Sequence, residues 1–327
     1  MSTLYGVAET EFDALAAGRG GPNAIRSLRR ARETKHLVMI QALRHLAAGV
    51  VPDSAAALEN AHILLGAARE CDAAAAGTVL GHPAVGAWLA TCLRRLTGAA
   101  DGPDPLRGDL EQLGAVAAAA AIHAGLAFEA TVPCRPDGVF LPGLGCARFD
   151  GMAAGPATIR YDGAQTWIEV AGGSVTIPDD PTEDGERWLG LRRLRSDVDG
   201  VVIEIELDDL DPARSGHGET VARRLHADEH AAWQRLLDAT WQVLVRNHPD
   251  RAAELTAGLV AIVPLVADST GTARTITARD AFGSMCATRS GTGRTFADSL
   301  IHEFQHSKLY ALADIAQLHT ADAEPVH

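Results

Sequence analysis

The spacing of apolar residues in the first 130 positions predicts helices. This segment is rich in alanine and leucine, and apolar residues recur at helical spacing, for example at Leu28, Ile40, Leu43 and Leu46. Three arginines between them are expected on the outer face of the same helix: Arg29, Arg30 and Arg32. Four histidines of this segment are expected at the surface or at the edge of the core: His36, His45, His62 and His82. We therefore expect a helical lobe over residues 1–130.

Residues 131–210 have a different pattern, made of short β-branched runs that proline and glycine interrupt. The runs include ATIRYDG (157–163), TWIEVAGGSVTI (166–177) and VVIEIEL (201–207). They predict a small antiparallel β section. LPGLG (141–145) is expected to be a turn, and ELDDLDP (206–212) a strand end that leads into a helix cap. The aspartates of the latter lack the ligand spacing of a calcium loop.

Helical spacing returns in residues 211–327. One apolar stripe comprises Trp233, Leu236, Leu237, Trp241, Leu244 and Val245. Residues 258–266 predict a buried strand, and residues 274–288 an extended segment with a bend at Gly283. Thr295 or Asp298 is then expected to cap a helix over residues 296–318. The three segments together predict a mainly helical α+β fold, in which a helical lobe over residues 211–327 follows the antiparallel β section.

Composition narrows the classes of partner. The 327-residue chain is 47% hydrophobic and 22% charged, as in ordinary globular proteins, and contains no apolar run of about 18 residues or more. Its net charge of −13 disfavours nucleic acids and anionic membranes as partners. The five cysteines are dispersed, and the first residues lack the pattern of a secretory signal. We therefore expect a protein of the reducing cytoplasm.

Candidate chemistry lies in the last expected helix, where His302-Glu303-Phe304-Gln305-His306 forms an H-E-x-x-H motif. Residues four apart on a helix differ by about 40° around its axis, so His302 and His306 share one face and can hold one metal ion. Glu303 lies beside that face, where a carboxylate can orient or deprotonate a metal-bound water. The motif therefore predicts a metal site.

The third ligand is less clear from spacing. Leu312 stands where the extended zinc-peptidase pattern has its third histidine, and Glu324 is the only later glutamate. His319, thirteen residues after His306, is the better candidate if the chain folds back. Asp314 would complete the two-histidine, one-carboxylate set of non-haem iron enzymes. However, it lies about 80° from His306 on a continuous helix, so a supporting role outside the ligand set is expected for it.

TARDAFGSM (277–285) and LIHEFQHSKLYALADIAQLH (300–319) together resemble the HExxH-motif domain of bacterial clusters that modify ribosomally made peptides. Four other stretches are also similar to this family: LPGLGCARF, WLGLRRL, ELDDLDPARS and residues 233–249. Members accompany radical SAM enzymes or are fused to them. They commonly continue past the equivalent of Leu318-His319 into a segment rich in proline, tryptophan and arginine, whereas this sequence ends at His327. The resemblance thus implies either a longer protein or another segment in that role.

The resemblance implies an iron(II)- and 2-oxoglutarate-dependent oxygenase that β-hydroxylates a side chain of a precursor peptide. It also implies a fold other than the double-stranded β-helix. Such an enzyme needs a cation for the distal carboxylate of 2-oxoglutarate, and Arg279 or Lys308 is the candidate. Each has a simpler alternative: Arg279 can form a surface salt bridge with Asp280, and Lys308 can lie on a solvated helix face.

Two other functions remain open at this stage. In a zinc-dependent metallopeptidase, Glu303 would be the general base and zinc the Lewis acid. A protein that only binds the precursor peptide, as an adaptor, would need no metal. The oxygenase is our principal prediction, with iron(II) held by His302, His306 and His319. A radical SAM enzyme of the same pathway is its expected protein partner.

Overall fold

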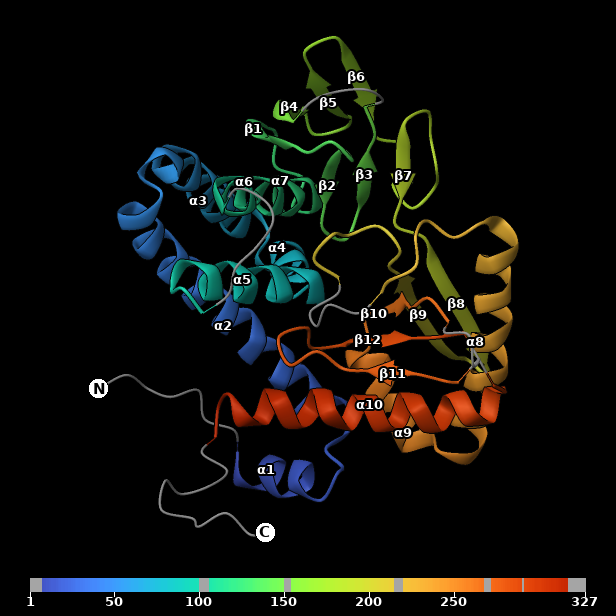
Figure 1. Cartoon of the computed structure of the whole chain (residues 1–327). Helices are drawn as coiled ribbons and strands as arrows, with labels where there is room; N and C mark the ends of the chain where they lie inside the picture. Colours follow the sequence, from blue (N-terminus) through green and yellow to red (C-terminus); the bar gives the residue numbers. More distant parts are fainter. Residues whose placement is uncertain are drawn as a thin grey trace.

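The structure of the chain, a computed structural model, describes residues 8–99, 106–149, 154–214, 220–267, 272–289 and 291–316. Figure 1 shows helices from the first part of the chain on one side, small sheets above them, and later helices around a further sheet. The first helices are α1 (Glu9–Ala16), α2 (Gly21–Val50), the 3-10 helix η1 (Pro52–Ser54), α3 (Ala55–Cys71), α4 (Ala73–Leu80), α5 (Pro83–Leu96), α6 (Leu106–Glu111) and α7 (Leu113–His123). The predicted helical lobe is therefore helical throughout its described part up to residue 123.

Two antiparallel sheets follow these helices. The four-stranded sheet has the order β1 (Phe128–Cys134), β4 (Gly155–Tyr161), β5 (Thr166–Val170) and β6 (Gly173–Thr176). The three-stranded sheet consists of β2 (Val139–Leu141), β3 (Gly145–Ala147) and β7 (Trp188–Gly190). The predicted turn at residues 141–145 joins β2 to β3. Gly145 lies so close to β7 that a Cβ atom there would be 2.3 Å from the carbonyl oxygen of Leu189.

The third sheet joins the middle of the chain to its later part. Its order is β11 (Thr275–Ile276), β12 (Ser284–Ala287), β10 (Ala261–Pro264), β9 (Val201–Leu207) and β8 (Arg193–Val198). β10 pairs in parallel with both β9 and β12, whereas the two outer pairs are antiparallel. All four residues of β10 are buried, as its continuous apolar run predicts for a central strand. The last helices are α8 (Ala227–Asn247), α9 (Pro249–Gly258) and α10 (Gly293–Ala313).

The described chain thus has the predicted mainly helical α+β fold, and its sheets do not close into a barrel. Two details of the β section differ from the prediction. β8 and β9 leave the antiparallel segment and pair into the sheet of the later part of the chain. Among the described residues after β9 no helix begins before Ala227, and ELDDLDP itself ends in a turn, so the prediction that it leads into a helix cap is wrong. Asp208 instead accepts hydrogen bonds from the backbone N–H groups of Leu210 and Asp211 in a turn.

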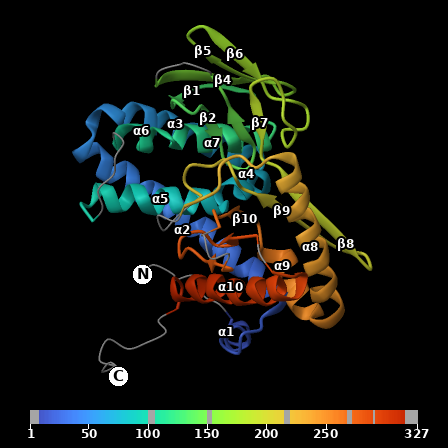
Figure 2. The ribbon, with the colours of Figure 1, turned by 45° about the vertical axis from the view of Figure 1, so that its right-hand side comes forward.

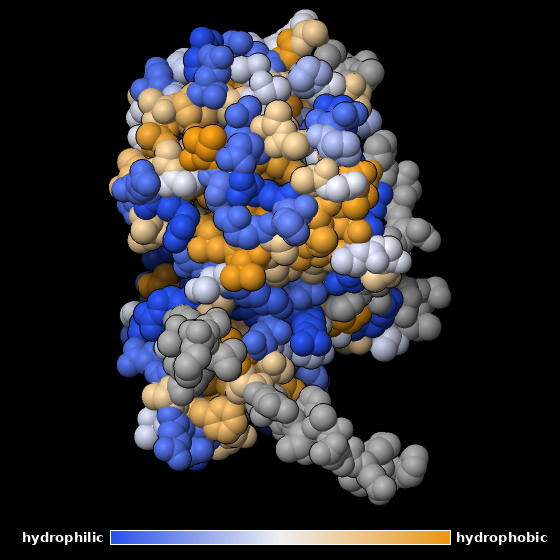
Figure 3. Space-filling model, turned by 90° about the vertical axis from the view of Figure 1, so that its left-hand side faces the viewer, coloured by the Kyte–Doolittle hydropathy of each residue, from blue (hydrophilic) through white to orange (hydrophobic). Residues whose placement is uncertain are grey.

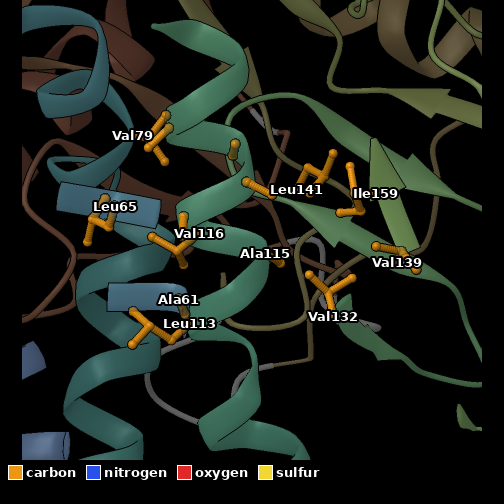
Figure 4. Packing of buried hydrophobic residues seen from close by; sticks show 14 of the residues in the cluster. Ala61, Leu65, Val79, Leu113, Ala115, Val116, Val132, Val139, Leu141 and Ile159 are labelled. Atoms are coloured by element: carbon orange, nitrogen blue, oxygen red, sulfur yellow. The ribbon is translucent and has the colours of Figure 1, made fainter. Parts of the chain in front are cut away.

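Two hydrophobic clusters supply most of the core. The first packs α3, α4, α5 and α7 against the two antiparallel sheets; Figure 4 shows Leu113 and Val116 of α7 between α3 and the strands that carry Val132 and Ile159. α7 is apolar around its whole circumference, as expected of a helix buried on all sides. The second cluster packs α8, α9 and α10 around the five-stranded sheet.

α2 belongs to both clusters. Its first half contributes Ile25 and Leu28 to the second cluster, and its later residues Ile40 and Leu43 contribute to the first. A helix of 30 residues is about 45 Å long, and Figures 1 and 2 show α2 running from α3 and α4 to α9 and α10. α2 therefore connects the two hydrophobic clusters, to which all three sequence segments contribute.

Arg32 corrects one prediction for α2. It was expected on the outer face, but only 2% of its surface is exposed. Its Nη1 lies 2.7 Å from Asp314 Oδ2 at the end of α10, and its Nη2 donates to the carbonyl oxygen of Arg279 at 3.1 Å. A carboxylate partner 282 positions later in the sequence is what makes burial of this guanidinium possible.

A membrane-spanning segment must be both long and apolar. Within the described ranges, no helix combines the length and the apolar character that crossing a bilayer requires.

His36 and His82 are buried rather than at the edge of the core, with 2% and 4% of their surfaces exposed. Burial lowers the pKa of His36 to about 4. Burial alone would also lower the pKa of His82, but the carboxylate of Glu206, 2.8 Å from its Nε2, raises this pKa to about 9. The ion pair of His82 and Glu206 therefore joins the first helix group to β9.

We expect His82→Gln to lower the free energy of unfolding by about 2 kcal/mol near pH 6, because a buried hydrogen bond to a charged group contributes about 1.5–3 kcal/mol. The raised pKa means that this contribution is fully present below about pH 6.5 and is lost as the pH rises through 9. Urea unfolding of both proteins should therefore show a difference that shrinks between about pH 7 and pH 10. The exposed His45→Gln serves as control, and a difference that persists unchanged to high pH would contradict the assignment.

Candidate metal centre

α10 carries the H-E-x-x-H motif, and its start is fixed by a capping box. The backbone N–H of Thr295 donates to Thr292 Oγ1 at 3.3 Å, and the backbone N–H of Thr292 donates to Thr295 Oγ1 at 2.8 Å. The predicted cap residue Thr295 thus takes part as the third helical residue, while Thr292 is the cap itself. Asp298, the alternative, lies inside the helix.

One face of α10 is buried in the second cluster through Phe296, Leu300, Phe304, Ala311 and Leu312. Phe304 lies directly over Gly258, the last residue of α9. A Cβ atom at Gly258 would lie 2.5 Å from both Phe304 Cζ and Ile25 Cγ2, so only glycine permits this approach. The packing of α10 on α9 and α2 therefore fixes which face of the motif helix points outward.

His302 and His306 lie on that outward face, with His302 exposed and His306 half-buried. Their Nε2 atoms are 3.0 Å apart, and their ring centroids are 4.7 Å apart. Two imidazole nitrogens each about 2.1 Å from one metal ion, at about 90° to each other, are separated by about 3.0 Å. The separation is thus that of a hydrogen bond between the two rings and also fits two adjacent ligands of one divalent metal ion.

Tyr310, one turn after His306, stacks on its ring with a centroid distance of 6.1 Å and an angle of 24° between the planes. Tyr310 was not among the residues predicted for the site, although its i,i+4 spacing from His306 is a usable signal. The phenol ring limits the rotation of the His306 imidazole and so helps to keep Nε2 directed toward His302.

Glu303 points in another direction and is 5% exposed. Its carboxylate accepts hydrogen bonds from Thr275 Oγ1 at 2.8 Å and from Thr277 Oγ1 at 2.6 Å. Both threonines belong to the extended segment that contains β11. The carboxylate therefore connects the motif helix to this segment. Local sequence did not indicate this role, because the partners lie 26 and 28 positions earlier.

A third protein ligand does not appear in the described part of the chain, where no group of three histidine, cysteine, aspartate or glutamate side chains is arranged around one point. His319, the predicted third ligand, lies outside the described residues. Asp314 ends α10 and is held by cations of α2: Arg32 at 2.7 Å and Lys35 at 2.8 Å. Burial would raise the pKa of Asp314, but these neighbouring cations lower it below its usual value.

Lys308, one of the two candidates for the distal carboxylate of 2-oxoglutarate, is only 3% exposed. Its Nζ lies 3.0 Å from Glu254 Oε2 in α9 and donates to the carbonyl oxygen of Gly18 at 3.2 Å. Two residues beyond His306, it lies about 200° around the helix and thus on the opposite side. The alternative of a solvated helix face is therefore wrong for Lys308, because Glu254 compensates the buried charge.

Arg279, the other candidate, has a side chain that is 59% exposed. Its Nη2 lies 3.4 Å from Asp314 Oδ1, a long contact for a charged pair. Asp280, the neighbour considered as its partner, bonds instead to Lys35 at 3.5 Å and to Arg94 at 3.3 Å. The structure thus places Arg279 at the end of α10, two turns past His306, and not directly beside the histidine pair.

No protein-family model matches the chain, and a search of curated proteins gives no match either.

We expect the protein to bind one iron(II) ion per chain when it is loaded without oxygen. His302→Ala and His306→Ala should each weaken binding at least about 100-fold, since loss of a residue that only supports a ligand already costs about 10- to 100-fold. Elemental analysis and anaerobic titration measure this, with the exposed His45→Ala as control. Normal metal content in His306→Ala would rule out the pair as ligands.

Thr277→Val should lower the free energy of unfolding by about 2 kcal/mol, because it leaves a buried carboxylate with one hydrogen bond fewer. Thermal and urea unfolding report the change. Thr176→Val, at an exposed position of β6, is the matched control and should change stability by less than about 0.5 kcal/mol. Equal effects of the two substitutions would show that the Glu303 carboxylate does not depend on Thr277.

Proposed function

We propose that the protein is an iron(II)- and 2-oxoglutarate-dependent oxygenase that β-hydroxylates a side chain of a ribosomally made peptide. The observation that carries the proposal is the convergence of His302 and His306 Nε2 atoms, 3.0 Å apart, on the outward face of a fixed helix. Two neutral imidazoles suit iron(II) and leave positions for a bidentate keto acid and for oxygen. His319 remains our candidate for the third ligand.

Bound iron(II) would supply the chemistry that couples decarboxylation of 2-oxoglutarate by oxygen to hydroxylation, giving succinate, carbon dioxide and the hydroxylated residue. The residues of the chain would orient the metal ligands and hold them in place. Tyr310 restrains His306, and the face opposite the histidines is buried against α9 and α2. Because His302 and His306 sit on a helix whose start and packing are fixed, these two ligands would be held in place by regular structure.

The surroundings of Glu303 favour the oxygenase over a zinc peptidase. In a peptidase this carboxylate must be free to take a proton from the metal-bound water. Here it is buried and accepts two threonine hydroxyl groups, one of them at 2.6 Å. This supports a structural role for Glu303, which an oxygenase tolerates and a hydrolase does not.

Arg279 is the better of the two candidates for the distal carboxylate of 2-oxoglutarate. Lys308 is neutralised by Glu254 inside the protein, whereas Arg279 is exposed and makes only a 3.4 Å contact with Asp314. Asp314 keeps Arg32 and Lys35 as partners when Arg279 moves away. To meet a cosubstrate held at the histidine pair, the guanidinium group would have to move back along α10 by about two helical turns.

The test uses protein loaded with iron(II), 2-oxoglutarate and air, together with a candidate precursor peptide. We expect a gain of one oxygen atom in the peptide and an equal amount of succinate. His306→Ala should lower succinate formation at least about 100-fold, while Arg279→Ala should raise the KM for 2-oxoglutarate about tenfold or more. His45→Ala should leave both unchanged.

Glu303→Gln separates the alternatives. The oxygenase should keep most of its activity in this variant, because glutamine can still accept a hydrogen bond from one threonine. Peptide cleavage with zinc and without 2-oxoglutarate, abolished by Glu303→Gln, would establish the peptidase instead. Absence of stoichiometric metal with retained peptide binding would establish the adaptor.

A further inference from the structure

β1 is an edge strand, with α6 and α7 packed beside it. It stands at the end of the four-stranded sheet and pairs only with β4 among the described strands. Pro133 lies opposite Pro156 in this pairing. Neither proline has an N–H group, so this is a pair without hydrogen bonds between the strands, and the pairs alternate from there along the strand. The backbone groups of Glu129 and Thr131 and the carbonyl of Pro133 therefore point outward, available to another strand.

A groove runs along this free edge. It has a volume of about 1300 Å³, and its walls are β1 on one side and α3 with the α6–α7 region on the other. Both views of the ribbon show β1 beside α6 and α7, and Figure 3 faces the side of the molecule on which α2, α3 and α5 lie, where hydrophobic and hydrophilic patches alternate. Gly114 of α7 lines the groove and lies close to β1: a Cβ atom there would be 3.2 Å from Val132 Cγ1 and 3.4 Å from the Thr131 carbonyl oxygen.

The groove is acidic. Its lining includes five carboxylates: Asp53, Asp109, Glu111, Glu129 and Asp137. Two arginines oppose them, and each is already paired with a carboxylate of the lining: Arg107 with Glu111 at 2.7 Å and Arg135 with Asp109 at 2.9 Å. The remaining negative charge favours a basic occupant. It also disfavours a second copy of this chain, which would bring its own Glu129 to the same edge and a net charge of −13.

A smaller cavity of about 250 Å³ opens at the end of the groove. The two share Asp109, Arg135 and Pro212 in their linings. Its lining combines apolar side chains, such as Trp88 and Val85 of α5, with the charged side chains of Asp109, Arg135 and Asp211. Burial raises the pKa of Asp211. A chain lying along β1 can therefore place one side chain in this cavity.

We propose that the groove binds an extended, lysine- or arginine-containing peptide segment, which pairs with β1 as a fifth strand of the four-stranded sheet. Outward backbone groups of β1 supply the affinity that is independent of sequence, and the acidic lining and the cavity select the side chains. This proposal rests on the proposed function in one respect: it identifies the docked peptide as the molecule to be modified. Because β1 packs with the first hydrophobic cluster and the histidines lie on α10 beside the second, the docked segment and the modified residue are different parts of the peptide.

The test measures binding of a labelled nonapeptide of alternating lysine and valine to the metal-free protein by fluorescence polarisation. Thr131→Pro removes an outward N–H group without touching the pairing of β1 with β4. Ser174→Pro makes the same change on β6, the opposite edge of the sheet, where Ser174 also points outward by the same alternation. We expect Thr131→Pro to weaken binding at least tenfold and Ser174→Pro less than twofold, with similar melting temperatures. Ala213→Trp, which fills the cavity, should weaken binding about threefold or more.

A twin peptide with glutamate in place of lysine should bind at least tenfold more weakly, and added salt should weaken binding of the lysine peptide. Equal loss of affinity in Thr131→Pro and Ser174→Pro, or equal affinity for both peptides, overturns the docking proposal. So does a dimer in sedimentation that Thr131→Pro dissociates, since a second chain then occupies the edge. Unchanged affinity in Ala213→Trp overturns the proposed role of the cavity in binding a side chain of the peptide.

Failure of the docking site and failure of the proposed function give different results. Tight binding of the lysine peptide without any oxygen transfer in the activity test leaves the docking site intact and refutes the oxygenase. Hydroxylation of a peptide with an unchanged KM in Thr131→Pro supports the oxygenase and refutes the docking site.

Discussion

The arrangement depends on one helix that serves two hydrophobic cores. α2 packs its first half with α9 and α10, and its second half with α3 and α4. Because a helix is stiff, a rotation of α2 about its axis would move its side chains in both cores at once. The packing of the first core and the packing of the second are therefore not independent. Arg32 and Lys35, near the middle of α2, hold Asp314 at the end of α10 and so fix the motif helix along its axis as well.

Several charged side chains on or next to α10 are buried. Lys308 pairs with Glu254, Arg32 with Asp314, and Glu303 with two hydroxyl groups. Buried ion pairs contribute little net stability, because loss of hydration offsets most of the attraction. They do penalise any alternative placement of the helix, since each would leave a buried charge unpaired. The outward direction of the histidine pair is thus specified by what lies on the opposite faces of α10.

The sequence was sufficient for features that depend on local spacing. The helix with the motif, the shared face of His302 and His306, the apolar run of β10 and the bend at Gly283 all follow from residues within a few positions of one another. Features that depend on distant partners were missed. Arg32 resembled a surface residue because Asp314 is far away in sequence, and nothing near Glu303 identified Thr275 and Thr277. The parallel pairing of β10 with β9 and β12 was missed for the same reason, since it is decided by segments that helices and loops separate.

The contact of Lys308 with the carbonyl oxygen of Gly18 joins residues 290 positions apart, and the same region includes the Phe304 contact over Gly258. During synthesis the first hydrophobic cluster has all its helices and strands once residue 188 has left the ribosome, whereas the second waits for α10. The nascent chain therefore carries the apolar side chains of Ile25 and Leu28 without their final neighbours for most of translation. The histidine pair acquires its fixed orientation only once α10 has packed, so a metal ion held by this pair, as proposed, would be bound after that packing.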